Sequence, residues 1–253
     1  MTGVPRVLFV TGTDTGVGKT IATAALAAAL GGTGRSVAVY KPVQAGTEDG
    51  AGDIDTVVRL AAPAVAREGV RLPDPMAPVA AAARAGVPLP AAPDHLATIA
   101  ALGAAHDHVI VEGAGGVLVE LGTDGHTLAD LAVAAPQPSG TVVVCRSGLG
   151  TLNHTALTLE ALRHRDAVIA GLLLGAWPEH PSLIEEDNRR RLATGPAPLL
   201  GAVPDGAGLL DPGHFRRRAA EWLDSWPAPA PHPAHPHPHR DAPQRDMSIP
   251  GRH

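Results

Sequence analysis

The sequence predicts one α/β domain built on a doubly wound, mostly parallel sheet with helices on both faces. Three observations support this prediction. Short runs rich in Val, Ile and Leu recur along the 253 residues, helix-like segments separate them, and glycines or polar residues follow the runs directly. The runs lack in/out alternation, which is typical of strands buried on both faces. Alternating strands and helices imply right-handed crossovers within a single sheet.

Each element is predicted from its local composition. Six apolar runs are expected to form strands, at 6–11, 36–40, 108–112, 141–146, 168–174 and 199–203. Five segments between them have helical character, at 19–30, 93–106, 127–135, 152–165 and 182–192. Near the end, apolar residues at 215, 219, 222, 223 and 226 follow a helical spacing. We expect this last helix to pack on the domain rather than to bind a membrane.

The composition changes abruptly after residue 226. Residues 1–226 are expected to form the folded domain, and the Pro- and His-rich segment 227–253 lacks any hydrophobic period and is predicted to be disordered. Glycines and polar residues gather after the strands, and the carboxyl edge of an open parallel sheet is where ligands bind. Several loops are therefore expected to meet at one site.

The overall composition excludes several classes of protein. A net charge of −5 argues against a general nucleic-acid binder, and the longest uncharged apolar stretch, 21–30, is too short to span a bilayer. The lone cysteine, Cys145, lies in an apolar run and excludes an internal disulfide framework. With no leader segment visible at its start, the protein is expected in the cytoplasm without a membrane partner.

The strongest motif is a glycine-rich loop between the first predicted strand and helix, Gly12-Thr-Asp-Thr-Gly-Val-Gly-Lys-Thr20. Successive backbone N–H groups in such a loop face one phosphate group, and the helix N-terminus adds its dipole. Lys19 would reach the β- and γ-phosphates and Thr20 would bind Mg²⁺. The loop is one residue longer than the standard pattern. It nevertheless indicates a P-loop NTPase-type domain that binds a nucleoside triphosphate.

A metal site in such a loop also needs a carboxylate. Glu112 ends a buried apolar run, where an unpaired charge would be costly, and glycines follow it. Asp53 and Asp55 are two further candidates, although both could simply cap a helix that runs to Leu60. The sequence alone leaves the choice between these two aspartates open.

Lysine usage singles out two positions. The chain has 20 Lys and Arg residues, of which only Lys19 and Lys41 are lysines. Lys41 follows the second predicted strand and opens Lys41-Pro-Val-Gln-Ala-Gly46. A compact ammonium and a planar guanidinium are not equivalent at a reacting centre, so both lysines are predicted to be catalytic.

Four motifs in the correct order resemble those of the dethiobiotin synthetase family: the glycine loop, Lys41-Pro-Val, Val111-Glu-Gly-Ala-Gly-Gly116 and Leu149-Gly-Thr-Leu-Asn-His154. The resemblance spans about residues 5–226. It implies an ATP-dependent cyclo-ligase of biotin biosynthesis that takes 7,8-diaminononanoate, CO₂ or bicarbonate, a nucleoside triphosphate and Mg²⁺. A carbamate would be phosphorylated and the second amine would close the ureido ring. The family also implies a homodimer with the substrate site at its interface.

The resemblance assigns roles by position. The metal ligands would be Thr20, Asp53 and Glu112. The nucleotide would contact Gly16, Val17, Gly18, Lys19, Thr20, Ile21, Asp53, Glu112, Gly113, Ala114, Gly115, Gly175, Ala176, Pro204, Asp205 and Gly206. The substrate would contact Lys41 and Ala45 and, across the dimer, Gly150, Thr151, Leu152 and Asn153.

Two positions depart from the family pattern. Ala45 stands where a Ser or Thr hydroxyl is usual, and Thr47 is a candidate replacement. The segment Gly175-Ala-Trp-Pro178 stands where an Asn-Asp pair often reads adenine, which predicts that other nucleoside triphosphates are accepted. The main alternative is a partitioning-type ATPase switch. Those proteins carry an extra lysine early in the loop, whereas this chain has Thr13-Asp-Thr15. Another alternative is a second ATP-dependent synthetase of the same superfamily.

Overall fold

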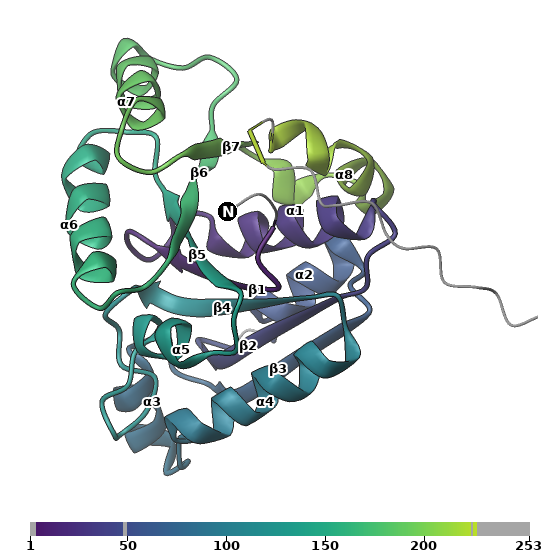
Figure 1. Ribbon diagram of the computed structural model, residues 1–253, viewed down its shortest axis with the longest axis vertical. Coiled ribbons are helices and arrows are strands. Elements are labelled where there is room, and N and C mark those ends of the chain that lie inside the picture. Colours follow the sequence, from purple (N-terminus) through teal and green to yellow (C-terminus); the bar gives the residue numbers. More distant parts are fainter. Residues whose placement is uncertain (1–3, 48–49, 224, 227–253) are drawn as a thin grey trace, which may run out of the picture.

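The computed structural model describes residues 4–47, 50–223 and 225–226, so the predicted tail at 227–253 lies outside the described residues. Seven strands form one sheet in the order β3-β2-β4-β1-β5-β6-β7, and every neighbouring pair is parallel. Helices cover both faces of this sheet (Figure 1). The predicted doubly wound α/β architecture is therefore confirmed.

The strands are β1 (Val7–Gly12), β2 (Val37–Ala45), β3 (Val65–Leu72), β4 (His108–Gly116), β5 (Ser139–Cys145), β6 (Ile169–Trp177) and β7 (Leu199–Pro204). The helices are α1 (Lys19–Gly31), α2 (Asp53–Ala61), α3 (Pro78–Ala85), α4 (Ala92–Ala105), α5 (Leu128–Ala134), α6 (Thr151–Arg163), α7 (Leu183–Ala193) and α8 (Pro212–Arg218). Two short 3₁₀ turns, η1 (Ala207–Leu209) and η2 (Ala219–Trp222), flank α8.

Alternate residues of the central strands enter separate apolar layers. Leu8 and Val10 of β1 pack with α1, α2 and α8, whereas Val7 and Phe9 pack with α3, α4 and α5. On β5, Val142 and Val144 join the first layer, and Val143 and Cys145 pack under α6 and α7. Because both faces are covered, β1, β5 and much of β4 consist mainly of apolar residues, which explains why they were recognisable without alternation.

Three sequence expectations are corrected by the fold. β3 was not predicted, because Val65–Leu72 is an edge strand whose residues alternate between exposed and partly buried positions. The helix α3 was also missed, because it has only eight residues and proline-containing segments lie on both sides of it. The second strand continues through residue 45 instead of ending at residue 40, so Lys41 lies within β2 and not after it.

The C-terminal segment packs on the domain as expected. Phe215 and Ala219 are fully buried, Trp222 is 5% exposed, and the rings of Phe215 and Trp222 meet edge to face with centroids 5.0 Å apart. Their layer is the one that contains α1. The apolar side chains of this segment are therefore used inside the domain.

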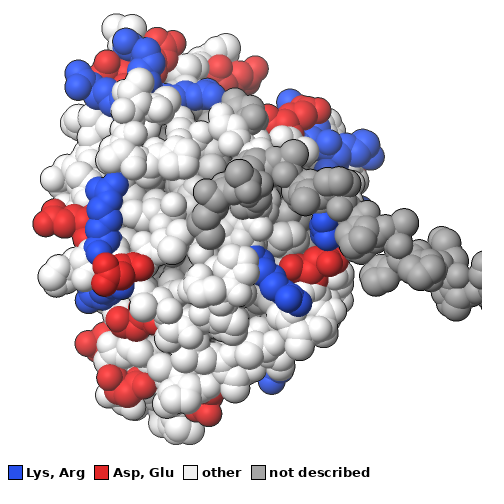
Figure 2. All heavy atoms as spheres, viewed as in Figure 1, with Lys and Arg blue, Asp and Glu red and all other residues white. Residues whose placement is uncertain are grey.

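Charged side chains of opposite sign lie beside one another on the face shown in Figure 2. On α7, Asp187 pairs with Arg190 at 3.2 Å and with Arg191 at 2.6 Å. None of the helices within the described ranges is long and apolar enough to cross a membrane.

Candidate active site

The phosphate-binding loop connects the central strand β1 to α1. Two of its glycines have left-handed backbone angles, with φ of 72° at Gly16 and 94° at Gly18, which residues with a Cβ atom rarely adopt. Lys19 and Thr20 form the first turn of α1, and no acidic side chain occupies that turn. The backbone amides and the positive end of the helix are thus available to an anion.

The loop lies directly on the end of β6. A Cβ atom added to Gly175 would lie 1.9 Å from the Val17 carbonyl oxygen, and one added to Gly18 would lie 2.5 Å from the Gly175 oxygen. Gly175 is therefore required for close backbone packing under the loop. This contact explains why glycine occupies position 175, which the sequence analysis did not explain.

Lys19 crosses its own loop. Its ammonium donates to the Asp14 carbonyl oxygen at 3.0 Å, and the residue is 8% exposed. Burial lowers the pKa of Lys19, and the nearby Lys41 ammonium lowers it further, while Glu112 and Asp53 partly offset both effects. In this arrangement the Lys19 ammonium has the neutral Asp14 carbonyl as its hydrogen-bond acceptor. An anionic phosphate would be a stronger acceptor for the ammonium.

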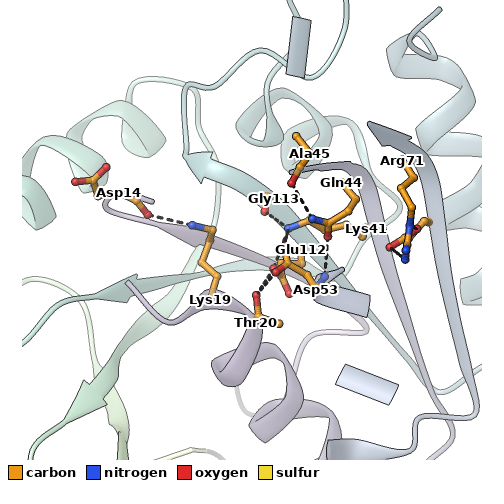
Figure 3. A network of polar contacts seen from close by, with 11 residues as sticks. Asp14, Lys19, Thr20, Lys41, Gln44, Ala45, Asp53, Arg71, Glu112 and Gly113 are labelled. Atoms are coloured by element: carbon orange, nitrogen blue, oxygen red, sulfur yellow. Dashed lines mark hydrogen bonds and ion pairs between the residues drawn. The ribbon is translucent and has the colours of Figure 1, made fainter. Parts of the chain in front are cut away.

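Lys41 is the centre of the most deeply buried charge cluster in the described part of the chain. Its ammonium lies 2.9 Å from Glu112 Oε1, 2.6 Å from Asp53 Oδ2 and 2.9 Å from the Gly113 carbonyl oxygen. The side chains of Lys41 and Glu112 are 3% and 1% exposed. Figure 3 shows these groups pointing toward one another from β2, β4 and the start of α2.

The cluster changes the ionisation of its members. Burial alone would lower the pKa of Lys41, but Glu112 and Asp53 outweigh it and hold the pKa above its usual value. Burial would likewise raise the pKa of Asp53, but the Lys41 ammonium outweighs it and holds the pKa below its usual value. The two carboxylates thus favour the protonated form of Lys41 in this arrangement.

Thr20 links this cluster to the phosphate-binding loop. Its hydroxyl donates to Asp53 Oδ1 at 2.8 Å and lies 3.1 Å from Glu112 Oε1. Mg²⁺ prefers hard oxygen donors and usually takes only one or two carboxylates from a protein. One hydroxyl and two carboxylates converging beside a phosphate-binding loop fit that requirement.

The geometry separates the two candidate aspartates. Asp55 accepts from the Gly52 N–H at 2.7 Å and pairs with Arg71 at 2.9 Å, on the outer side of α2. These contacts hold the pKa of Asp55 below its usual value. Only Asp53 reaches Thr20 and Lys41, so the structure brings Asp53 into the cluster and leaves Asp55 outside it.

A cavity of about 730 Å³ opens beside the cluster. Its walls contain many of the residues that the sequence analysis had selected. They also contain a short apolar segment that follows β3. Its lining comprises Thr15, Gly16, Gly18, Lys19, Thr20, Ile21, Lys41, Val43, Gln44, Ala45, Gly46, Ala51, Asp53, Pro75, Met76, Ala77, Pro78, Ala114, Gly115 and Val119. The phosphate loop lies at one part of this lining, and Ala45 and 75–78 lie at another.

Some predicted residues lie outside this cavity. Gly150 is the N-cap of α6. In the first turn of this helix Thr151 is buried, whereas Leu152 and Asn153 are exposed. Pro204 pairs with Trp177 at the end of β7, and the N–H of Asp205 donates to the Trp177 carbonyl at 2.8 Å. The following turn packs against the start of α1, because a Cβ atom on Gly208 would lie 2.8 Å from the Ile21 side chain.

Two other expectations concern single residues. The Thr47 hydroxyl donates to the Leu72 carbonyl at 3.1 Å, and Thr47 is not among the described residues that line the cavity. Ala176 sits between Gly175 and Trp177 on β6 and contributes no side-chain hydrogen-bonding group. The Trp177 ring packs under the Arg189 guanidinium, 5.0 Å from its centroid.

Sequence reasoning missed two residues next to the site, Gln44 and Arg71. Gln44 is 5% exposed and accepts from the Asp53 N–H at 2.8 Å. Arg71 lies on β3, the strand that was not predicted, and binds Asp55 and Glu68. A polar residue inside an apolar strand was the only available signal for Gln44.

Comparisons with known proteins agree with this geometry. A family model described as an AAA domain matches residues 6–212. The ATP-dependent dethiobiotin synthetase BioD of Mycobacterium avium (strain 104) is 54% identical over 186 residues, which cover 74% of this chain and 81% of the relative. The protein of the same name from Rhodococcus erythropolis (strain PR4 / NBRC 100887) is 50% identical over 190 residues, covering 74% and 83%.

Among solved structures, the fold resembles the septum site-determining protein MinD of Pyrococcus horikoshii OT3 in complex with Mg-ADP, with a TM-score of 0.56 and 17% identity over 87% of this chain and 93% of that chain. It also resembles the cell division ATPase MinD of Pyrococcus furiosus, with a TM-score of 0.52 and 18% identity over 87% and 95%. At such identities these likenesses show the fold alone. The relatives at 50–54% identity show more: the chain belongs to the family of ATP-dependent dethiobiotin synthetases.

Proposed function

We propose that this protein is an ATP-dependent dethiobiotin synthetase, a cyclo-ligase of biotin biosynthesis. One amine of 7,8-diaminononanoate adds to CO₂ and loses a proton, giving a carbamate. A carbamate oxygen attacks the γ-phosphorus and ADP leaves. The second amine then attacks the carbamate carbon, loses a proton and expels phosphate, which closes the ureido ring. The observation that carries the proposal is the buried Lys41 ammonium beside the phosphate-binding loop.

Charge is the main obstacle in this reaction, because carbamate and γ-phosphate are both anions. Lys19 and Lys41 line the same cavity, so both can face negative groups placed between them. The raised pKa of Lys41 keeps its ammonium charged, which supports electrostatic stabilisation of the carbamate and not proton abstraction. The few lysines of this chain thus lie where a point charge is useful.

The phosphate cradle would comprise Gly16, Val17, Gly18, Lys19, Thr20 and Ile21, together with Gly113, Ala114 and Gly115 of β4, of which Ala114 and Gly115 line the same cavity. Thr20, Asp53 and Glu112 would hold Mg²⁺, which when bound neutralises charge on the β- and γ-phosphates. The loop amides and Lys19 orient the nucleotide, and Lys41 orients the carbamate against it.

Substrate and base contacts are proposed at the edges of this region. The apolar lining at Ala45 and 75–78 fits the hydrocarbon chain of the diamine. The exposed first turn of α6, Gly150 to Asn153, would receive the substrate carboxylate from the partner subunit of a homodimer. Pro204, Asp205 and Gly206, together with Gly175 and Ala176, would flank the nucleobase through backbone groups. We further propose that the enzyme works in the cytoplasm, in keeping with its single buried cysteine.

Phosphate release from ATP tests the proposal. It should be slow with enzyme, ATP and Mg²⁺ alone, and should rise when diaminononanoate and bicarbonate are both added, because the carbamate is the phosphoryl acceptor. Omitting either component is the control. Rapid hydrolysis without both, or stimulation by DNA or lipid vesicles instead, would contradict the proposal and favour a partitioning-type switch.

A further inference from the structure

Gln44 is a buried polar residue three positions after Lys41 on the same strand. Its Oε1 accepts from the Asp53 N–H at 2.8 Å, and its Nε2 donates to the Ala45 carbonyl at 3.0 Å. Both contacts are drawn in Figure 3. The side chain lies between strand β2 and the first turn of α2, with only 5% of its surface exposed.

The two partners fix the orientation of the amide group. An N–H donor faces one end and a carbonyl acceptor faces the other, so exchanging oxygen and nitrogen would oppose two donors and two acceptors. Burial makes such a mismatch costly, since water cannot replace the lost partners. The Gln44 side chain is therefore held in one orientation.

The contact controls a residue of the proposed metal site. Asp53 is the first residue of α2, and the residue before it, Gly52, has no side chain that could cap the helix. Gln44 supplies an acceptor for one of the free N–H groups at this helix start. The carboxylate of the same Asp53 residue reaches Thr20 at 2.8 Å and Lys41 at 2.6 Å.

The surrounding backbone leaves little alternative space. A Cβ atom on Gly52 would lie 3.2 Å from Gln44 Cγ and 3.1 Å from both the Arg71 guanidinium and a Glu68 carboxylate oxygen. On the outer side, Arg71 binds Asp55 at 2.9 Å and the Gly50 carbonyl at 3.2 Å. The start of α2 thus has a buried attachment at Asp53 and an exposed attachment at Asp55.

We propose that Gln44 is a positioning residue that holds the Asp53 carboxylate in place for the metal ion. Because Gln44 and Lys41 share one strand, the contact fixes α2 relative to the ammonium that Asp53 neutralises. A neutral amide does this without adding charge to the cluster. This inference rests on the proposed function, which supplies the Mg²⁺ that Asp53 would bind.

The test compares Gln44→Met with the matched control Asp55→Asn. Methionine keeps the length of the side chain and removes both hydrogen bonds, whereas Asp55→Asn weakens only the exposed attachment of the same helix turn. Binding of Mn²⁺, a spectroscopic substitute for Mg²⁺, is titrated by electron paramagnetic resonance in the presence of saturating ADP. Loss of groups that orient metal ligands typically weakens metal binding by about 10–100-fold. We expect at least tenfold weaker Mn²⁺ binding for Gln44→Met and less than about threefold for Asp55→Asn.

A second readout distinguishes positioning from general stability. In steady-state assays the Mg²⁺ concentration for half-maximal turnover should rise in Gln44→Met, while kcat at saturating Mg²⁺ falls much less. If that variant does not fold, Gln44→Asn, which is too short to reach Asp53, should show the same weakened Mn²⁺ binding. Mn²⁺ binding within twofold of wild type, or an equal effect of Asp55→Asn, would overturn the proposal. Failure of the proposed function is seen separately, as absent diamine-dependent phosphate release by the wild-type enzyme.

Discussion

The Lys41 ammonium and the Glu112 carboxylate form an ion pair of 2.9 Å whose two side chains are almost completely buried. Removing one partner of such a pair leaves the other as an uncompensated buried charge. The pair is completed by Asp53, so one ammonium faces two carboxylates. This relationship makes each member of the cluster a sensitive position for substitution.

Replacing Lys41 with Arg should abolish most activity while sparing nucleotide binding. The guanidinium keeps the charge, but its planar fork does not fit a site in which the native side chain is 3% exposed. We expect turnover with diamine and bicarbonate to fall by at least about 100-fold, or about 3 kcal/mol. Nucleotide affinity, measured by calorimetry, should change by less than about threefold. The parallel Lys19→Arg variant should instead weaken nucleotide binding, and near wild-type turnover of Lys41→Arg would refute the role of Lys41.

Replacing Glu112 with Gln should stop turnover, because the amide keeps the shape and removes a negative charge from the metal site. Asp53→Asn should have a similar effect for the same reason. Asp55→Asn should reduce turnover only slightly, since Asp55 faces Arg71 and not the cluster. Circular dichroism at matched concentrations serves as the folding control. If Asp55→Asn lowers turnover more than Asp53→Asn does, the wrong aspartate has been assigned to the metal site.

Nucleotide choice should be broad. The segment Gly175-Ala-Trp-Pro178 contains no side-chain amide, the Trp177 ring is packed against Arg189, and the Trp177 backbone carbonyl accepts from the Asp205 N–H. Few side-chain groups are therefore left to distinguish bases. GTP, CTP and UTP should each support turnover within about 1–2 kcal/mol of ATP in kcat/KM, the scale of one neutral hydrogen bond. A preference for ATP of a thousandfold or more would contradict this expectation.

Stability should decrease between pH 7 and 5 because of His95. Burial lowers the pKa of this histidine to about 4, and the neighbouring His126 adds to the effect, although Asp94 and Asp124 partly offset it. Its ring nitrogen Nδ1 lies 2.7 Å from the Tyr40 hydroxyl. The unfolded chain takes up a proton near pH 6.5 and the folded chain does not, so the free energy of unfolding should fall by about 2 kcal/mol over this range.

Urea denaturation at pH 7 and pH 5 measures this difference. In His95→Phe the loss between the two pH values should be smaller by about that amount, whatever the absolute stability of the variant. The exposed His164→Asn variant serves as the control for replacing a surface histidine. A His95→Phe protein with an unchanged pH dependence would show that the histidine is protonated in the folded state.

The four motifs, taken together in their order along the chain, predicted more of the candidate site than any single residue did. Runs such as 108–112 were recognisable because both faces of the sheet are covered, and the loop glycines marked the phosphate site. The residue pattern alone could not choose between Asp53 and Asp55, because both belong to the first turn of one helix and differ only in the direction they face. The family resemblance pointed to Asp53. Gly175 acts through a contact with the backbone of Val17, far away in the sequence, and Gln44 acts through the first N–H of the helix that follows its strand. Neither contact is encoded in a local pattern.

The strand order has a consequence for how this enzyme family can vary. β4, which carries Glu112, lies between β1, which leads to Lys19, and β2, which carries Lys41. The lateral separation of β1 and β2 is therefore about two spacings of 4.8 Å, set by backbone hydrogen bonds. Insertions or deletions in the loops after β2, β3 or β4 can remodel what enters the cavity without changing this separation. The reaction geometry is thus a property of the sheet, and substrate fit is a property of the loops around it.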